Sequence, residues 1–129
     1  MRWRTVIGIL MLAGLGCLGC AKSPPTMAGG KSVSYWVEAL RDPDPKTRKK
    51  AAFKLGNVGE ADAAALPALV GALKDKDPGV RREVILALLK FGPAASEAIP
   101  TLLDLQQHDR NAQVRDYAAK AVKRLRAEK

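Results

Sequence analysis

Cysteine and histidine are scarce in this sequence of 129 residues. Both cysteines, Cys17 and Cys20, stand near its start, and the single histidine is His108. A disulfide therefore cannot stabilise the rest of the chain, and the nitrogen and sulfur ligands of a zinc site are lacking there. No serine or threonine adjoins His108, so an activated nucleophile is not indicated either. We expect a protein without enzymatic activity, metal, cofactor or small-molecule substrate, with His108 as a solvated turn residue.

Apolar runs are also scarce, and the prominent one lies at the start of the chain. It follows two arginines and extends from Val6 to Leu18, and Gly19 and Cys20 come directly after it. A basic start, a short apolar middle and small residues before the end are typical of an export signal. The run is shorter than the about 20 residues that a membrane-spanning helix needs. We therefore assign residues 1–19 to a signal peptide.

The end of this segment resembles a bacterial lipoprotein signal, in which a cysteine is lipidated and becomes the mature N-terminus. The resemblance implies lipidation of Cys20, because Cys20 ends the apolar run and a polar stretch follows it; Cys17 is the alternative. That family favours leucine three positions before the cysteine, where Cys20 has Cys17 and Cys17 has Gly14. An ordinary cleaved signal and an uncleaved N-terminal anchor are the other interpretations. The expected location is the periplasmic or cell-surface side of a bacterial membrane.

Residues 20–33 are rich in proline, glycine, serine and threonine and show no apolar periodicity. This composition is typical of a flexible linker. We interpret the segment as a tether between the lipid anchor and a domain that spans residues 34–129. The chain carries 22 lysines and arginines against 13 aspartates and glutamates, a net charge of +9, which favours an acidic partner.

From Ser34 onward the chain repeats itself. Leu40, Asp42 and Arg48 return 33 positions later as Leu73, Asp75 and Arg81. A third copy begins at the same spacing, and one inserted residue near Gln107 then changes the offset to 34. Self-similarity at such a period indicates a solenoid of small helical or mixed units. We place the repeats at about residues 34–59, 64–92 and 97–126.

Each copy predicts two helices. The second helix of each has an apolar stripe at i, i+4, i+8 and i+11, which keeps one helical face towards a core. The three stripes are Thr47, Ala51, Leu55 and Val58; Val80, Val84, Leu88 and Phe91; and Val114, Ala118, Val122 and Leu125. We place the first helices at about 34–41, 64–74 and 96–107, with Ser34 and Ser96 as N-caps, and end the second helices at Gly59 and Gly92. Strand patterns are lacking, so the domain is predicted to be all-α.

The pattern Leu-x-x-Ala-Leu-Lys-Asp-x-Asp-Pro-x-Val-Arg, followed by an Ala/Leu-rich helix and glycine, resembles the short bacterial HEAT-like repeats. The resemblance implies an α-solenoid of about three helix pairs that serves as a non-enzymatic protein-interaction or scaffold module. It also implies a ladder that links neighbouring repeats through a turn aspartate and the arginine six residues later. The matching pairs are Asp42 and Arg48, Asp75 and Arg81, and Asp109 and Arg115.

The second helices carry the candidate partner surface, since by resemblance they line the concave side of the stack. It comprises Lys46, Lys50, Phe53, Lys54, Leu86 and Tyr117. The three lysines recur at i, i+4 and i+8 with no acid between them, and Phe53 and Leu86 occupy equivalent positions on adjacent helices. An apolar strip with basic edges suits an acidic peptide or a partner helix. A solvated basic face without a partner is the alternative.

Two other functions are weaker alternatives. The basic balance also suits nucleic acid, but export argues against it, and only two aromatic residues lie among the basic helices for base stacking. Cyanobacterial bilin lyases carry similar repeats, which suggests a lyase-associated subunit, but they have many more repeats than this chain. We therefore expect an unknown protein partner, with the membrane reached through the N-terminal lipid.

Overall fold

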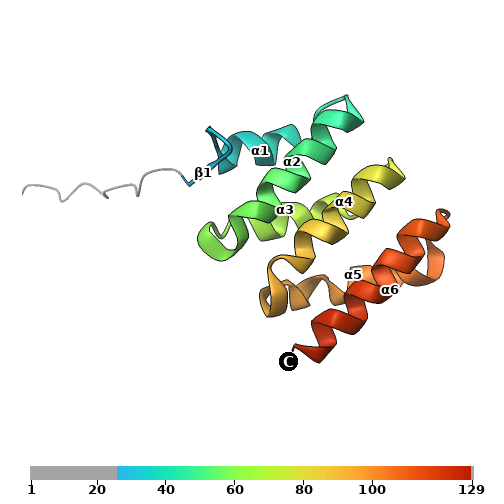
Figure 1. Cartoon of the computed structure of the whole chain (residues 1–129). Helices are drawn as coiled ribbons and strands as arrows, with labels where there is room; N and C mark the ends of the chain where they lie inside the picture. The colour runs from blue at the N-terminus through green and yellow to red at the C-terminus, as the bar shows by residue number, and fades with distance from the viewer. Residues whose placement is uncertain (1–25, 129) are drawn as a thin grey trace, which may run out of the picture.

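Three helix pairs stack one upon another in the computed structural model, which describes residues 26–128 (Figure 1). The pairs are α1 (Val33–Ala39) with α2 (Pro45–Val58), α3 (Ala65–Ala72) with α4 (Pro78–Leu89), and α5 (Ile99–His108) with α6 (Ala112–Ala127). Two short 3-10 helices, η1 (Gly59–Ala61) and η2 (Gly92–Ala98), connect them. The predicted all-α solenoid is confirmed. The predicted signal peptide, both cysteines and residues 20–25 of the predicted tether lie outside the described residues.

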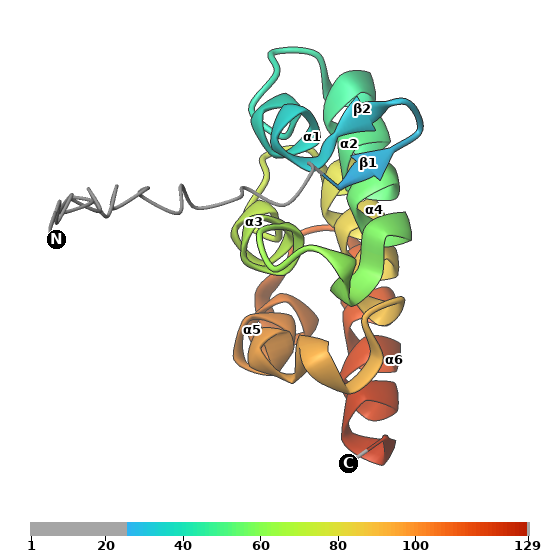
Figure 2. The same ribbon diagram turned by 90° about the vertical axis from the view of Figure 1, so that its left-hand side faces the viewer.

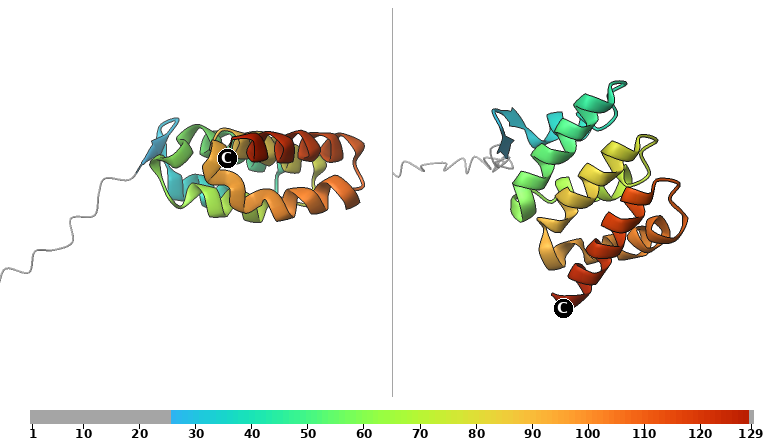
Figure 3. Two further views of the ribbon diagram at one scale, coloured as in Figure 1. Left: turned by 90° about the horizontal axis from the view of Figure 1, so that it is seen from below. Right: turned by 45° about the vertical axis from the view of Figure 1, so that its right-hand side comes forward.

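The helices form two layers. One layer consists of α1, α3 and α5, and the other consists of α2, α4 and α6 (Figure 2, Figure 3). Gly59 and Gly92, which were predicted to end the second helices, follow α2 and α4 with positive φ angles of 58° and 56°, a conformation that glycine adopts without a steric cost. In the part of the chain that is described, no helix has the length and apolar character needed to cross a membrane.

An Asp-x-Asp motif starts the second helix of the first two repeats, and Asp109-x-Asn111 starts that of the third. The Asp42 carboxylate accepts a hydrogen bond from the Asp44 backbone N–H at 2.8 Å, and Asp44 caps α2 by accepting from the Lys46 N–H at 3.1 Å. At the start of α4, Asp75 accepts from the Asp77 N–H at 2.9 Å, and Asp77 caps the helix by accepting from the Val80 N–H at 2.9 Å. A proline follows each of these caps, at the first helical position where its missing N–H costs nothing. Local chemistry therefore explains why the motif repeats.

The core lies between the two layers and follows the predicted stripes. The most deeply buried side chains include Leu55, Val80, Val84, Leu88 and Leu125 of the second helices, which meet Leu69, Leu73 and Leu102 of the first helices. At the edge of the stripes, Thr47 and Val58 are half-buried. Removing these apolar side chains from water is the main stabilising term, about 25 cal/mol for each Å² of apolar surface.

The second helices also pack directly against one another, and one glycine sets how closely α2 and α4 approach. A Cβ atom added at Gly56 would lie 2.8 Å from both the Cα and the Cβ of Ala87 on α4. A real Cβ cannot come that close, so only glycine fits at this crossing. The predicted apolar stripes include neither Gly56 nor Ala87, because these two residues face the neighbouring repeat and not the first helices.

A hairpin covers the N-terminal end of the stack, where a flexible tether was predicted over residues 20–33. Strands β1 (Met27–Ala28) and β2 (Lys31–Ser32) pair antiparallel across Gly29 and Gly30. Ala28 is buried, and its carbonyl accepts a 2.7 Å hydrogen bond from the Trp36 indole N–H. The prediction is thus wrong for residues 27–32, because the buried indole N–H needs an acceptor and this segment supplies it.

The predicted caps of the first helices are also corrected. The hydroxyl of Ser32, and not that of Ser34, caps α1 by accepting from the Tyr35 N–H at 3.3 Å. Ser34 lies inside α1, and Ser96 lies inside η2. All three first helices are shorter than predicted, since 3-10 turns and loops take up residues near their ends.

Candidate functional site

Arginines near the starts of the second helices join neighbouring repeats. Arg48 of α2 reaches Asp75 of the next repeat, where its Nε donates to Oδ2 at 2.8 Å and its Nη2 donates to Oδ1 at 3.0 Å. Its Nη1 donates to the backbone oxygens of Asp42 and Pro43 at 2.8 and 3.1 Å. Only 5% of the Arg48 side chain and 10% of the Asp75 side chain are exposed. This is the two-point geometry that favours arginine over lysine.

The second step of the ladder has the same geometry. Arg81 of α4 donates from Nε and Nη2 to the two carboxylate oxygens of Asp109, each at 2.7 Å. Its Nη1 donates to the backbone oxygens of Asp75 and Lys76 at 2.8 and 3.2 Å. The Asp109 side chain is almost fully enclosed, with 3% exposed. Three repeats are thus joined by two enclosed ion pairs.

The charges of the ladder stabilise one another. Burial alone would raise the pKa of Asp109, but hydrogen bonds from the Arg81 side chain and the Asn111 backbone N–H hold that pKa below its ordinary value. The hydrogen bond with Asp75 raises the pKa of Arg48. Both shifts favour the charged forms of Asp109 and Arg48.

The geometry corrects one detail of the predicted ladder. Each arginine bonds the backbone oxygen of the aspartate six residues before it, whereas the carboxylate that it binds belongs to the following repeat. Arg115 fits this pattern: its Nη1 donates to the backbone oxygens of Asp109 and Arg110 at 2.7 and 3.3 Å, and no described carboxylate pairs with it. In residues 26–128 every buried side-chain nitrogen and oxygen has a hydrogen-bond partner. The ladder therefore holds repeats in place and leaves no enclosed polar atom for a ligand.

Part of the predicted partner surface is accessible on α2. Lys46 and Lys50 are exposed, and 45% of Phe53 is exposed. The Lys90 ammonium, at the end of α4, lies 4.5 Å from the centre of the Phe53 ring and donates a 2.6 Å hydrogen bond to Asn57 Oδ1. That distance is within the range of a cation–π interaction. The surface therefore combines an aromatic ring with cations from two repeats, and Lys90 is a member that the sequence patterns missed.

The other predicted members are less accessible. Leu86 and Tyr117 are half-buried, and the Tyr117 ring lies about equally far from Arg82 and Lys120, at 6.0 and 5.9 Å. Lys54 is half-buried, and its ammonium group lies against Gly29 in the hairpin turn. Lys46, Lys50 and Phe53 are thus the accessible members of the surface on α2.

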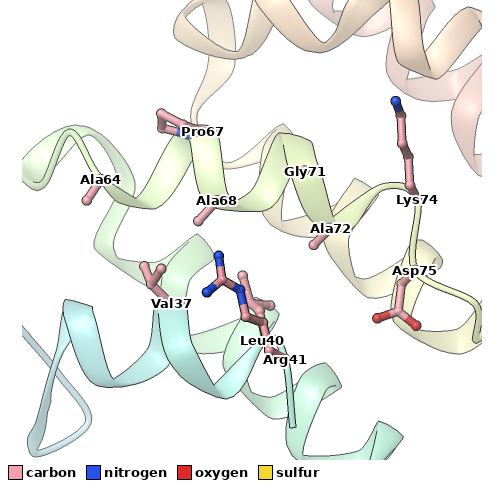
Figure 4. Close-up of a pocket in the computed structure, with 10 residues that line it drawn as sticks. All are labelled: Val37, Leu40, Arg41, Ala64, Pro67, Ala68, Gly71, Ala72, Lys74 and Asp75. Atoms are coloured by element: carbon pink, nitrogen blue, oxygen red, sulfur yellow. The ribbon is translucent and has the colours of Figure 1, made fainter. Parts of the chain in front are cut away.

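A cleft that the sequence did not indicate lies in the opposite layer, between α1 and α3 (Figure 4). It has a volume of about 640 Å³. Its lining is Val37, Leu40, Arg41, Ala64, Pro67, Ala68, Gly71, Ala72, Lys74 and Asp75. The small residues of α3 make the cleft, and its three charged residues lie towards the C-terminal ends of α1 and α3 (Figure 4). Of these three, Asp75 is already bound to Arg48.

The one histidine–carboxylate pair among the described residues lies on the surface. His108 is exposed at the end of α5, with Nδ1 2.9 Å from Asp104 Oδ1, also exposed. Within residues 26–128, no three histidine, cysteine or acidic side chains are placed to hold a metal ion.

Stacked helix pairs, a core between two layers and an arginine–aspartate ladder define an α-solenoid of short repeats. The family of HEAT repeats matches residues 33–123, from the first residue of α1 into the last turns of α6. The chain belongs to this family, and it is a repeat module of the kind used for protein interaction and scaffolding. A comparison with curated proteins finds no match.

Proposed function

We propose that this protein is an exported, lipid-anchored interaction module without enzymatic activity, and that it binds an acidic protein partner on the exposed face of α2. The observation that carries the proposal is the surface of α2. This helix contains no acidic residue, and its exposed Lys46 and Lys50 accompany a half-exposed Phe53. The proposal therefore rests on two facts: HEAT repeats commonly mediate protein contacts, and α2 exposes basic and aromatic side chains.

The two kinds of side chain have different roles in the proposed complex. Lysines attract an acidic partner over a distance of about 8 Å at physiological salt and mainly speed its encounter. A large aromatic side chain that becomes buried in the complex mainly slows its dissociation. Nucleic acid fits less well, because cations already lie near the faces of Phe53 and Tyr117 that bases would need for stacking.

Support for the anchor comes from the first twenty residues of the sequence, where an apolar run between arginines and Cys20 has the features of a lipoprotein signal. In the full chain, Cys20→Ser should release the protein from membranes, whereas the neighbouring Cys17→Ser should not. Lipoprotein modification adds at least two acyl chains, so a high-salt wash should leave the wild type bound. Release by salt would show that charge holds the protein and that the lipoprotein assignment is wrong.

The partner surface is tested by isolating the tagged protein from membranes and measuring binding kinetics with the protein that accompanies it. Lys46→Glu/Lys50→Glu should slow association on the order of tenfold, and Phe53→Ala should speed dissociation on the order of tenfold. The control is Lys123→Glu/Arg126→Glu, which changes the net charge equally at exposed positions of α6. If the α2 variants behave like this control, the partner does not bind there.

A further inference from the structure

The N-terminal end of the stack exposes apolar and basic side chains together. Met27 and Tyr35 are among the most exposed large apolar residues of the described chain, at 57% and 47%. The Lys31 ammonium lies 4.3 Å from the centre of the Tyr35 ring, and that ring meets Trp36 edge to face at 5.0 Å. The Lys50 ammonium lies 6.0 Å from the Trp36 ring. We call the hairpin β1–β2 together with α1 the N-terminal cap.

Positive charge predominates around the N-terminal cap. The Lys54 side chain extends from α2 to the hairpin turn. Its ammonium group lies so close to Gly29 that a Cβ atom added to this glycine would be 2.6 Å from the Lys54 Nζ. The sequence from Cys20 to Val37 contains two lysines and no acid. On one side of Tyr35, the acids Glu38 and Asp42 line a shallow groove together with Arg41, which lies 3.7 Å from Glu38. A surface that approaches this end therefore meets several lysines around a half-exposed tyrosine.

The length of chain before the N-terminal cap limits what can approach it. Six residue steps separate Cys20 from Thr26, the first described residue. At about 3.3–3.6 Å for each step, the fully extended segment spans about 22 Å at most. If the lipid is attached at Cys20, Thr26, which precedes the N-terminal cap, stays within about 22 Å of the membrane surface.

We propose that the N-terminal cap docks on an anionic phospholipid surface, with the Tyr35 ring and Met27 at the level of the headgroups and Lys31 and Lys54 against the phosphates. This inference rests on the lipid anchor of the proposed function and adds a second membrane contact to it. Tyrosine is enriched at membrane interfaces because its ring is apolar and its hydroxyl is polar. Lysines near an anionic leaflet each strengthen binding about fivefold.

Docking in this way orients the whole solenoid. The repeats follow one another away from the N-terminal cap, so that α5 and α6 lie at the opposite end of the stack (Figure 2). With the N-terminal cap on the membrane, the stack extends outward and the basic surface of α2 is reached from the side. A short tether with a docked end would thus present the partner site in one orientation.

The test uses a chain that begins at Ala21 and so carries neither the signal segment nor the lipid. It keeps the whole described core, which extends from Ala28 to Leu125, and circular dichroism checks its helix content. Co-sedimentation is measured with mixed phosphatidylglycerol–phosphatidylcholine vesicles and with phosphatidylcholine vesicles alone. We expect binding to the anionic vesicles only, and we expect it to weaken as salt is raised.

Variants then locate the contact. Lys31→Glu should weaken binding to the anionic vesicles on the order of tenfold, and Tyr35→Ser should weaken it several-fold. The matched control is Lys123→Glu, the same charge change at an exposed position of α6, which should change binding less than about twofold. Absence of binding, an equal loss in the control, or no effect of Tyr35→Ser would each refute the docking of the N-terminal cap. Failure of the lipid anchor would be a separate result, because attachment through the lipid is measured only by the Cys20→Ser release experiment on the full chain.

Discussion

Replacing Arg81 with alanine should destabilise the fold far more than the same change at Arg115. Arg81→Ala removes two 2.7 Å bonds to the Asp109 carboxylate, whose side chain is only 3% exposed in the wild type, and leaves it without the cation that it binds. Removing one member of such a buried pair costs about 3–5 kcal/mol. Arg115→Ala removes only two bonds to backbone oxygens, at 2.7 and 3.3 Å, and should cost about 1–2 kcal/mol.

Urea unfolding followed by circular dichroism measures this difference. With a slope of about 1–2 kcal/mol per molar urea for a domain of this size, Arg81→Ala should lower the midpoint by about 1.5 M or more, and Arg115→Ala by about 1 M. Arg82→Ala is a further control, because Arg82 makes only a 3.4 Å bond to Gln113 on the surface. Its expected cost is below about 0.5 kcal/mol.

A double-mutant cycle identifies the carboxylate as the cause. Asp109→Asn keeps a side-chain oxygen for the Asn111 N–H, which bonds Asp109 at 2.8 Å, but removes the charge that Arg81 neutralises. The double variant Arg81→Ala/Asp109→Asn should therefore be more stable than Arg81→Ala alone, since no buried charge remains unpaired. Equal losses at Arg81 and Arg115, or strictly additive effects in the cycle, would refute the assignment of the ladder energy to the ion pair between repeats.

Two further predictions concern the packing of the repeats and their response to acid. Gly56→Ala should destabilise the fold by about 1–3 kcal/mol, because the added Cβ would clash with Ala87. Gly71→Ala in α3 is the control: its added Cβ would meet no atom within 4 Å, so this variant should be neutral or more stable by up to about 1 kcal/mol. Urea midpoints of the two variants measure the difference, and a Gly56→Ala protein as stable as the wild type would contradict the close approach. Because folding lowers the pKa of Asp109, its contribution to stability is complete above the unfolded value of about 4 and is lost as the pH falls through the lower folded value. The stability difference between wild type and Asp109→Asn should therefore shrink between about pH 5 and pH 2, and a difference that stays constant over this range in urea titrations would contradict the shift.

Local and periodic features of the fold could be read from the sequence. The repeat period, the pairing of a short first helix with a longer second helix and the stripes that contain Leu55, Leu88 and Leu125 all follow from residue spacing along one helix. That spacing is set by 3.6 residues per turn and needs no knowledge of the neighbours. The capping aspartates before Pro45 and Pro78 belong to the same class, because a cap acts within three residues of its own position. The basic character of α2 was visible for the same reason.

The tertiary structure alone decided which groups from different repeats meet. The partner of Arg48 is Asp75, 27 residues away, although Asp42 is the nearer acid in sequence. Gly56 against Ala87, the Trp36 bond that folds residues 27–32 onto the stack, and the cleft between α1 and α3 are contacts of the same kind. Spacing along a helix determines which side chains share a face, but the distance between two helices depends on how the side chains of both pack together. That packing is a property of the whole stack, and no single segment of the sequence specifies it.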